Sequence, residues 1–367
     1  MTTAPPFRPL NSPGLNRQQR LLLSRVSRSF YLSIRLLPPA LQAPVAIGYL
    51  LARATDTVAD TSALPLAERQ TLLDLMKEAI HAPTDGSAQH LHQHLHLQIH
   101  DLTQAFAAQQ TNPHERALMQ ALPECLALLH TLSEADQASV RTVLGHITRG
   151  QQQDMTLFGH GPELLVALPT EADLDHYTWL VAGCVGEFWT ELCGRHLPGY
   201  ALLSQDEMLR IGREYGMGLQ RLNIIRDMGA DLADGRCYWP QETLALAGLT
   251  PEWLAQASTS KTDPKNLETL TPLYTQWLDH TQAQLACGMR YALALQPWRL
   301  RLASALPALI GARTVSLLRQ AGPAALTQRV KMPRYEVRAL LWRIALGWGS
   351  SKALEEQFRQ LSGEAPA

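Results

Sequence analysis

The chain lacks the features that mark nucleic-acid-binding, disulfide-linked and membrane-spanning proteins. Its 32 Lys and Arg residues nearly balance 33 Asp and Glu residues, and a net charge of -1 gives no reason to expect a nucleic-acid partner. Five cysteines, an odd number without metal-ligand spacing, predict reduced thiols in a cytoplasmic protein. No apolar run approaches the length of a bilayer span, and the nearest, residues 339–349, is too short and contains Arg343.

Strict alternation of apolar and polar residues, the pattern of half-buried strands, is also missing. Leu- and Ala-rich stretches with helical periodicity dominate instead, and they predict an all-α fold. The expected helices cover residues 17–37, 41–60, 115–133, 136–157, 173–196, 203–232, 265–294 and 299–321. We expect residues 1–16 to be a flexible leader, residues 17–349 to form one helical domain, and residues 350–367 to be a polar C-terminal tail.

Two pairs of aspartates stand out among the polar residues. Asp56 and Asp60 lie in RATDTVAD, and Asp227 and Asp231 lie in QRLNIIRDMGAD. Each pair has i,i+4 spacing on an expected helix, so both carboxylates project from one face, where like charges are mildly destabilising. A divalent cation reverses that effect, and Mg²⁺ prefers few protein carboxylates combined with phosphate oxygens. Two such pairs predict a diphosphate held between two helices.

Other polar residues extend each pair along its helix face. Tyr49 and Arg53 precede the first pair, and Gln220 and Asn223 precede the second, on helices that are otherwise apolar. Such a stripe predicts a buried, wet cavity, whereas a solvated helix face is the plain alternative. One pair alone would favour the plain alternative. Two pairs, each with arginine and amide or phenol donors in register, favour a metal and diphosphate site.

Four longer segments carry a family resemblance: Ser27 to Pro39 (SRSFYLSIRLLPP), Tyr49 to Asp60, Tyr177 to Trp189 (YTWLVAGCVGEFW) and Gln220 to Glu242. In order and approximate spacing they resemble the squalene and phytoene synthases, which are head-to-head prenyl transferases. The ending GRCYWPQE is more similar to the squalene synthase branch. Eukaryotic members usually have Glu immediately before the last Asp of each motif, whereas Ala59 and Ala230 stand here, which is the minimal form of bacterial relatives.

The resemblance implies an isoprenoid synthase-type fold with a central apolar cavity and a squalene synthase-like activity. Two farnesyl diphosphates would be joined head to head to presqualene diphosphate, and hydride from NADPH would then give squalene. Without hydride the same fold yields dehydrosqualene or phytoene, or stops at presqualene diphosphate. A catalytically dead lipid-binding or regulatory protein is an alternative from another class, but it would not need two intact Asp pairs. We expect a monomer, and the apolar chains of the substrate and product allow a peripheral membrane contact.

The resemblance also implies roles for individual residues. Mg²⁺ would be held by Asp56, Asp60, Asp227 and Asp231. The substrate would be bound by Ser27, Arg28, Ser29, Phe30, Arg53, Gln220, Asn223, Arg226 and Arg236. NADPH would be contacted by Arg28, Arg53, Asn223, Arg226 and, in the basic segment RVKMPR (residues 329–334), by Lys331 and Arg334. Two alternatives stay open, because an arginine such as Arg28 or Arg226 can pair with a neighbouring acid, and Ser27 and Ser29 can cap a helix.

Tyr177 is the best candidate for handling the proton that is lost when the cyclopropane ring closes. A phenol with an ordinary pKa of about 10 is a poor base, but nearby cations or released diphosphate could make it competent. Tyr49 is the second candidate, and a buried phenol bonded to a carboxylate is its plain alternative. The small residues Ala182, Gly183 and Gly186 predict close passage of a polyprenyl chain, and tight helix packing would explain them equally well.

Overall fold

The computed structural model describes residues 16–27, 30–61, 64–82, 98–99, 101, 103–259, 267–346 and 350–363. These residues are helical almost throughout, which confirms the predicted all-α class. The strands among them are the two-residue β1 (Val166–Ala167) and β2 (Arg236–Cys237), which pair in parallel. This short ladder ties the loop after one long helix to the loop after another, and both loops lie beside the site described below.

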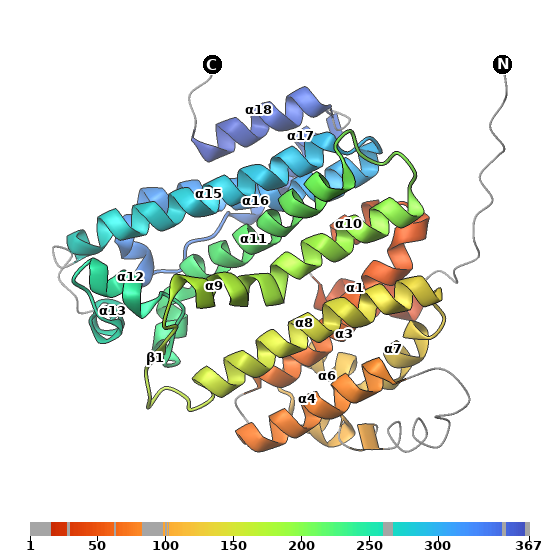
Figure 1. Cartoon of the computed structure of the whole chain (residues 1–367), viewed down its shortest axis with the longest axis horizontal. Helices are drawn as coiled ribbons and strands as arrows, with labels where there is room; N and C mark the ends of the chain where they lie inside the picture. Colours follow the sequence, from red (N-terminus) through yellow and green to blue (C-terminus); the bar gives the residue numbers. More distant parts are fainter. Residues whose placement is uncertain are drawn as a thin grey trace.

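The helices form an N-terminal and a C-terminal group (Figure 1). The first group contains α1 (Arg17–Val26), α2 (Phe30–Leu36), α3 (Pro39–Asp60), α4 (Leu66–His81), α6 (Pro113–Gln120), α7 (Leu122–Leu129) and α8 (Glu134–Phe158). The C-terminal group begins with α9 (Glu171–Thr178), the π-helical turn η2 (Trp179–Gly183), α10 (Cys184–His196), α11 (Gln205–Ala233), α12 (Gln241–Leu246) and α13 (Pro251–Ala257). It continues with the 3-10 turn η3 (Glu268–Leu270), α15 (Thr271–Ala294), α16 (Trp298–Ala321), the 3-10 turn η4 (Gly322–Leu326), α17 (Arg334–Leu346) and α18 (Ser351–Ser362).

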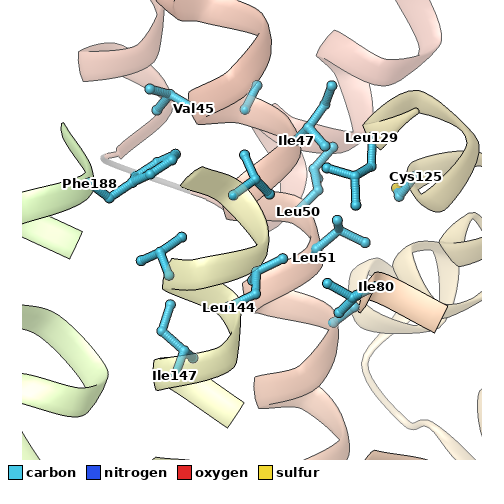
Figure 2. Close-up of a cluster of buried hydrophobic side chains, with 14 of the residues drawn as sticks. Val45, Ile47, Leu50, Leu51, Ile80, Cys125, Leu129, Leu144, Ile147 and Phe188 are labelled. Carbon is cyan, nitrogen blue, oxygen red and sulfur yellow. The ribbon is translucent and has the colours of Figure 1, made fainter. Parts of the chain in front are cut away.

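Two hydrophobic clusters hold these groups together. In the first, Leu50 and Leu51 of α3 face Ile80 of α4, Leu129 of α7 and Leu144 of α8 (Figure 2). Full burial of each such aliphatic side chain contributes about 1.5–3 kcal/mol relative to exposure. The second cluster lies between α11, α15 and α16, which run side by side in Figure 1. Because these apolar faces fix the rotation of α3 and α11 about their axes, the polar stripe of each helix is turned toward the space between the groups.

Three expected helices are interrupted in the structure. The stretch 17–37 divides into α1 and α2, and the stretch 115–133 divides into α6 and α7 at Ala121. Pro123 lies in the first turn of α7, where the missing N–H of proline is tolerated, although it could not continue α6. The stretch 173–196 contains the π-helical turn η2, whose wider turn carries one extra residue.

The C-terminal region differs most from expectation. The segment that we expected to be a polar tail contains α18, which packs on α15 and α16 and buries Leu354 and Phe358. Helix α16, extended through η4 to Leu326, is long and apolar enough by length and composition to cross a membrane, contrary to the sequence-based expectation. Within its most apolar stretch of 18 residues, 72% is buried inside the protein, as expected for a core helix.

Candidate active site

A cavity of about 1050 Å³ opens between α3, α8, α10 and α11. Apolar side chains such as Val45 of α3, Ile147 of α8 and Phe188 of α10 line it toward one end. Acidic side chains line it toward the C-terminal ends of α3 and α11. From Val45 to Asp60 the wall follows α3 for about 22 Å at 1.5 Å per residue. The cavity therefore combines a long apolar chamber with an acidic end.

The polar stripes of both sequence motifs lie on this cavity. The predicted site residues among its lining are Tyr49, Arg53, Asp56, Asp60, Tyr177, Gln220, Asn223, Asp227, Asp231 and Arg236. The first Asp pair comes from α3 and the second from α11, so segments that are far apart in sequence share one site. All four aspartates line this cavity, and among them Asp60 is also exposed to solvent.

Arg53 holds Asp56, the first aspartate of the α3 pair, in place. Its guanidinium forms an ion pair with Asp56 through Nη1 and a second one, at 2.7 Å, from Nη2 to Oε1 of Glu115 on α6. Burial, followed by the nearby charge of Asp60, raises the pKa of Asp56 to about 7. Burial likewise raises the pKa of Asp60, while Arg236 and Arg53 oppose that shift. In the protein alone, the ionised forms of this pair are therefore disfavoured.

The second acidic pair is arranged similarly on α11. Burial raises the pKa of Asp231 to about 7, against the opposing charge of Arg236. Arg226 pairs with Asp227, with Nε 3.1 Å from Oδ1, and does not line the cavity. The structure thus shows for Arg226 the ion pair that we gave as its alternative. Nη2 of Arg329, in the basic segment 329–334, reaches within 3.7 Å of Asp227 Oδ1.

The basic segment lies at this end of the site because η4 packs closely on α11. An ideal Cβ placed on Gly229 of α11 would lie 2.0 Å from the carbonyl oxygen of Leu326. No side chain could fit there, so the glycine permits the contact. Lys331 and Arg334 follow Arg329 and are exposed. They are not among the residues that line the cavity, unlike the predicted substrate-binding residues Arg53, Gln220, Asn223 and Arg236.

Tyr177, at the C-terminal end of α9, contacts residues that the sequence did not indicate. Its ring stacks on that of Tyr238 with centroids 5.2 Å apart, and the two hydroxyl oxygens are 3.5 Å apart. The Tyr238 hydroxyl donates to the carboxylate of Asp154 on α8. All three side chains line the cavity. Tyr49 also lines it, and its phenol lies 3.4 Å from the carbonyl oxygen of Val26.

The small residues of the third motif take part in tight helix packing, and two of them also lie on the cavity. Ala182 and Gly186 line the cavity. A Cβ on Gly186 would lie 1.9 Å from the carbonyl oxygen of Gly212, and one on Gly216 would lie 2.2 Å from that of Ala182. Close packing of α10 and η2 on α11 therefore requires these glycines.

The N-terminal motif is only partly described. Ser27 is buried, follows α1, and donates its hydroxyl to the carbonyl oxygen of Leu23, so it is not among the residues that line the cavity. This is the helix-end role that we gave as the alternative for the serines. Arg28 and Ser29 lie outside the described residues, as does the side chain of Phe30, the first residue of α2.

The donor set fits Mg²⁺ that is shared with a substrate. Within the described part of the chain, no three His, Cys, Asp or Glu side chains form a group that could hold a metal ion. The two pairs instead present hard carboxylate oxygens from different helices to one cavity. Burial is the main cause of the raised pKa of Asp56, Asp60 and Asp231, and a bound cation would favour their ionised forms. Mg²⁺ commonly binds through one or two carboxylates, with phosphate and water oxygens completing its shell.

Comparison with known proteins agrees with this geometry. Residues 23–336 match the sequence family described as squalene/phytoene synthase. The chain is 29% identical over 222 residues to the squalene synthase of Saccharomyces cerevisiae, a match that covers 60% of this chain and 44% of the yeast protein. It is 28% identical over 237 residues to a bifunctional lycopene cyclase/phytoene synthase of Phaeosphaeria nodorum, covering 63% of this chain and 35% of that protein. Both relatives are fungal, so they do not support the expected likeness to a bacterial branch.

Among solved structures, ligand-bound TcSQS superposes with a TM-score of 0.70 at 20% identity. The superposition covers 94% of this chain and 89% of that one. At this level of identity the likeness concerns the fold.

Proposed function

Because the chain belongs to the squalene/phytoene synthase family, we propose that it joins two farnesyl diphosphates head to head and reduces the resulting presqualene diphosphate to squalene. The observation that carries this proposal is the pair of aspartate motifs, from α3 and α11, at the acidic end of one apolar cavity. A cavity of about 1050 Å³ is large enough for drug-sized or larger ligands.

Ionisation of the first allylic diphosphate requires positive charge on the leaving group. Arg53 and Arg236 lie in the cavity wall and can donate charge-assisted hydrogen bonds to phosphate oxygens. Gln220 and Asn223, which are bonded to each other at 3.3 Å, add neutral donors on the α11 side. Mg²⁺ held by the four aspartates would supply the remaining charge when it is bound.

The apolar part of the cavity protects the cation that ionisation creates. Val45, Ile147 and Phe188 offer no nucleophile and keep water away from an allylic cation. Tyr215 and Tyr291 also line this part, but their hydroxyls are engaged with the carbonyl oxygen of Ser304 and with Thr190. The chamber can thus hold a reactive polyprenyl cation until the second farnesyl group captures it.

The reductive step depends on the basic segment 329–334. Arg329 lies beside Asp227, and the exposed cations Lys331 and Arg334 are free to receive the phosphates of a dinucleotide at the acidic end. When bound there, NADPH would supply the hydride that distinguishes squalene from dehydrosqualene. The likeness to a phytoene synthase favours the second candidate function, a dehydrosqualene- or phytoene-type synthase that omits reduction.

A peripheral membrane contact is part of the proposal because the product is a hydrocarbon. Tyr335 and Trp342 on α17 are each 71% exposed. They are seven residues apart on one helix face, with Arg338 between them. Aromatic rings flanked by arginine suit the interface of an anionic bilayer. We expect the protein to act as a cytoplasmic monomer that touches the membrane through this face.

Purified protein, farnesyl diphosphate and Mg²⁺, incubated with and without NADPH, test the function. We expect squalene only when NADPH is present and presqualene diphosphate when it is absent. Dehydrosqualene in both reactions would favour the second candidate. Absence of any thirty-carbon product, with a protein that is folded by circular dichroism, would contradict the proposed function.

A further inference from the structure

Three side chains from separate segments form a continuous chain of polar contacts in the cavity wall. Tyr238 Oη lies 2.9 Å and 2.8 Å from the two carboxylate oxygens of Asp154. Tyr177 Oη lies 3.5 Å from Tyr238 Oη, and the two rings stack at an interplanar angle of 26°. The ring of Phe158 packs edge-on against Tyr238 at 5.1 Å, which fixes that ring from the other side. The chain is therefore held by packing as well as by hydrogen bonds.

The hydrogen bonds run in one direction. An ionised carboxylate can only accept, so the hydroxyl proton of Tyr238 points to Asp154. The lone pairs of Tyr238 are then available to the hydroxyl of Tyr177, which donates to it. A lone pair of Tyr177 is left for a proton that arrives from the cavity. This order of donors is the one that would carry a proton from the cavity to the carboxylate.

Asp154 is suited to receive that proton. Burial raises its pKa to about 6, although hydrogen bonding to Tyr238 and the charge of Arg236 oppose the shift. The nearby charge of Asp60 adds to the rise, and hydrogen bonding to Tyr177 opposes it. A base with a pKa close to the working pH combines an available ionised form with useful proton affinity. Burial raises the pKa of Tyr177 and of Tyr238 well above the ordinary value, so both phenols stay neutral, and a neutral phenol is too weak a base to be the final acceptor.

We propose that Tyr177, Tyr238 and Asp154 form a proton relay that removes the proton lost when the cyclopropane ring closes, with Asp154 as the terminal acceptor. The inference rests on the proposed function and deepens it. After the first farnesyl cation joins the double bond of the second molecule, C1 of the first molecule still carries the hydrogen to be lost. Its C–H electron pair forms the new ring bond, and the proton passes to Tyr177 Oη. Tyr177 passes its own proton to Tyr238, which passes its own to Asp154.

Both phenols are therefore neutral before and after the step, and the only change in charge is on Asp154. A phenol that had to keep the proton would become a strong acid in a site with little water. The relay avoids this state because each phenol gives up one proton as it takes another. The carboxyl group returns the proton to solvent when the product leaves and water enters the cavity.

Asp154→Asn and Tyr238→Phe test the relay, since each keeps the shape of the side chain and removes one link. With farnesyl diphosphate and Mg²⁺ alone, we expect kcat for presqualene diphosphate to fall by about 10²-fold or more, with a smaller change in KM. The double variant should be no slower than the slower single variant, because both act on one step. Tyr274→Phe and Asp279→Asn, which change a core tyrosine and a surface aspartate outside the cavity, are the matched controls.

The decisive readout is the isotope effect with farnesyl diphosphate deuterated at C1. Slow proton removal should produce a primary isotope effect in both relay variants that the wild-type enzyme and the controls do not show. Wild-type rates in both variants would overturn the relay alone. Slow but folded variants without an isotope effect would indicate a packing role and would also overturn it. A wild-type enzyme that forms no condensation product would overturn the proposed function together with the relay.

Discussion

Asp231, at the acidic end of the cavity, is expected to lower the stability of the folded protein at alkaline pH. Its pKa is raised from 3.8 to about 7, first by burial. Because the folded pKa is above the unfolded one, the group contributes stability below about pH 4 that is lost as the pH rises through about 7. Asp231→Asn should therefore raise the melting temperature of the metal-free protein at pH 8, have little effect at pH 4, and reduce turnover by more than about 10²-fold.

Thermal melts in a chelator at both pH values, together with turnover in Mg²⁺, check this prediction. Asp279→Asn at the protein surface is the matched control, since its carboxylate is 63% exposed. A variant that melts lower at pH 8 and turns over normally would contradict the assignment of Asp231 to the metal site.

At the scale of single residues, a site residue could be predicted from the sequence only where it belongs to a local repeating pattern. Both Asp pairs repeat at helical spacing within one segment, so their common orientation could be predicted before the cavity was known. Glu115, Asp154 and Tyr238 carry no such pattern. They reach the site from α6, α8 and the loop after β2, and only tertiary packing brings Asp154 to a tyrosine that is 84 residues away. The resemblance to a family covered Tyr238 within GRCYWPQE but gave it no role.

At the scale of secondary-structure elements, the close contact between α10 and α11 can be tested by mutation. In Gly186→Ala the new methyl group would meet the carbonyl oxygen of Gly212 at 1.9 Å, so the helices must move apart. We expect a loss of about 1–3 kcal/mol in the free energy of unfolding. Gly48→Ala in α3 is the control, because its methyl group would meet Phe188 at an ordinary 3.6 Å. That change should stabilise the helix by about 0.5–1 kcal/mol. Equal effects in urea denaturation would refute the close contact.

The proposed membrane contact of the exposed α17 face can be tested in the same way. Replacing both Tyr335 and Trp342 by Ala should weaken cosedimentation with vesicles that contain anionic phospholipid, because the two rings supply the apolar contact. Leu202→Ala combined with Leu246→Ala removes exposed apolar side chains elsewhere, at 73% and 91% exposure, and should leave binding unchanged. Equal vesicle binding by wild type and the aromatic variant would remove α17 from the proposed membrane contact.

Long periodic helices were the most predictable elements. The expected stretches 136–157 and 203–232 correspond to α8 and α11 within two residues at each end. The π-helical turn within 173–196 was not predictable from periodicity, because one extra residue shifts the pattern without breaking it. Helix α18 was missed because few apolar residues, chiefly Leu354 and Phe358, make up its buried face.

At the scale of the whole molecule, the site draws on helices from α3 to α16, which is why we propose that residues 17–349 act as one domain. The basic segment at the C-terminal end of this range should serve only the second half-reaction. Replacing both Lys331 and Arg334 by Ala should leave presqualene diphosphate formation almost unchanged and raise the apparent KM for NADPH strongly, since each lost charge-assisted bond costs about 1.5–3 kcal/mol.

Steady-state kinetics of the two half-reactions separate these effects. Lys77→Ala combined with Arg319→Ala removes the same number of charges from a distant surface and is the matched control. Unchanged NADPH kinetics in the Lys331 and Arg334 double variant would show that the basic segment does not bind the cofactor.

A single-turnover experiment with farnesyl diphosphate and Mg²⁺, in the absence of NADPH, tests most directly whether both Asp pairs serve one head-to-head condensation. The account predicts that the wild-type enzyme accumulates presqualene diphosphate, and that Asp56→Asn on α3 and Asp227→Asn on α11 each slow its formation by more than about 10²-fold while the protein stays folded. Release of farnesol or of a fifteen-carbon cyclised product by the wild-type enzyme, or near-normal condensation by either variant, would contradict it.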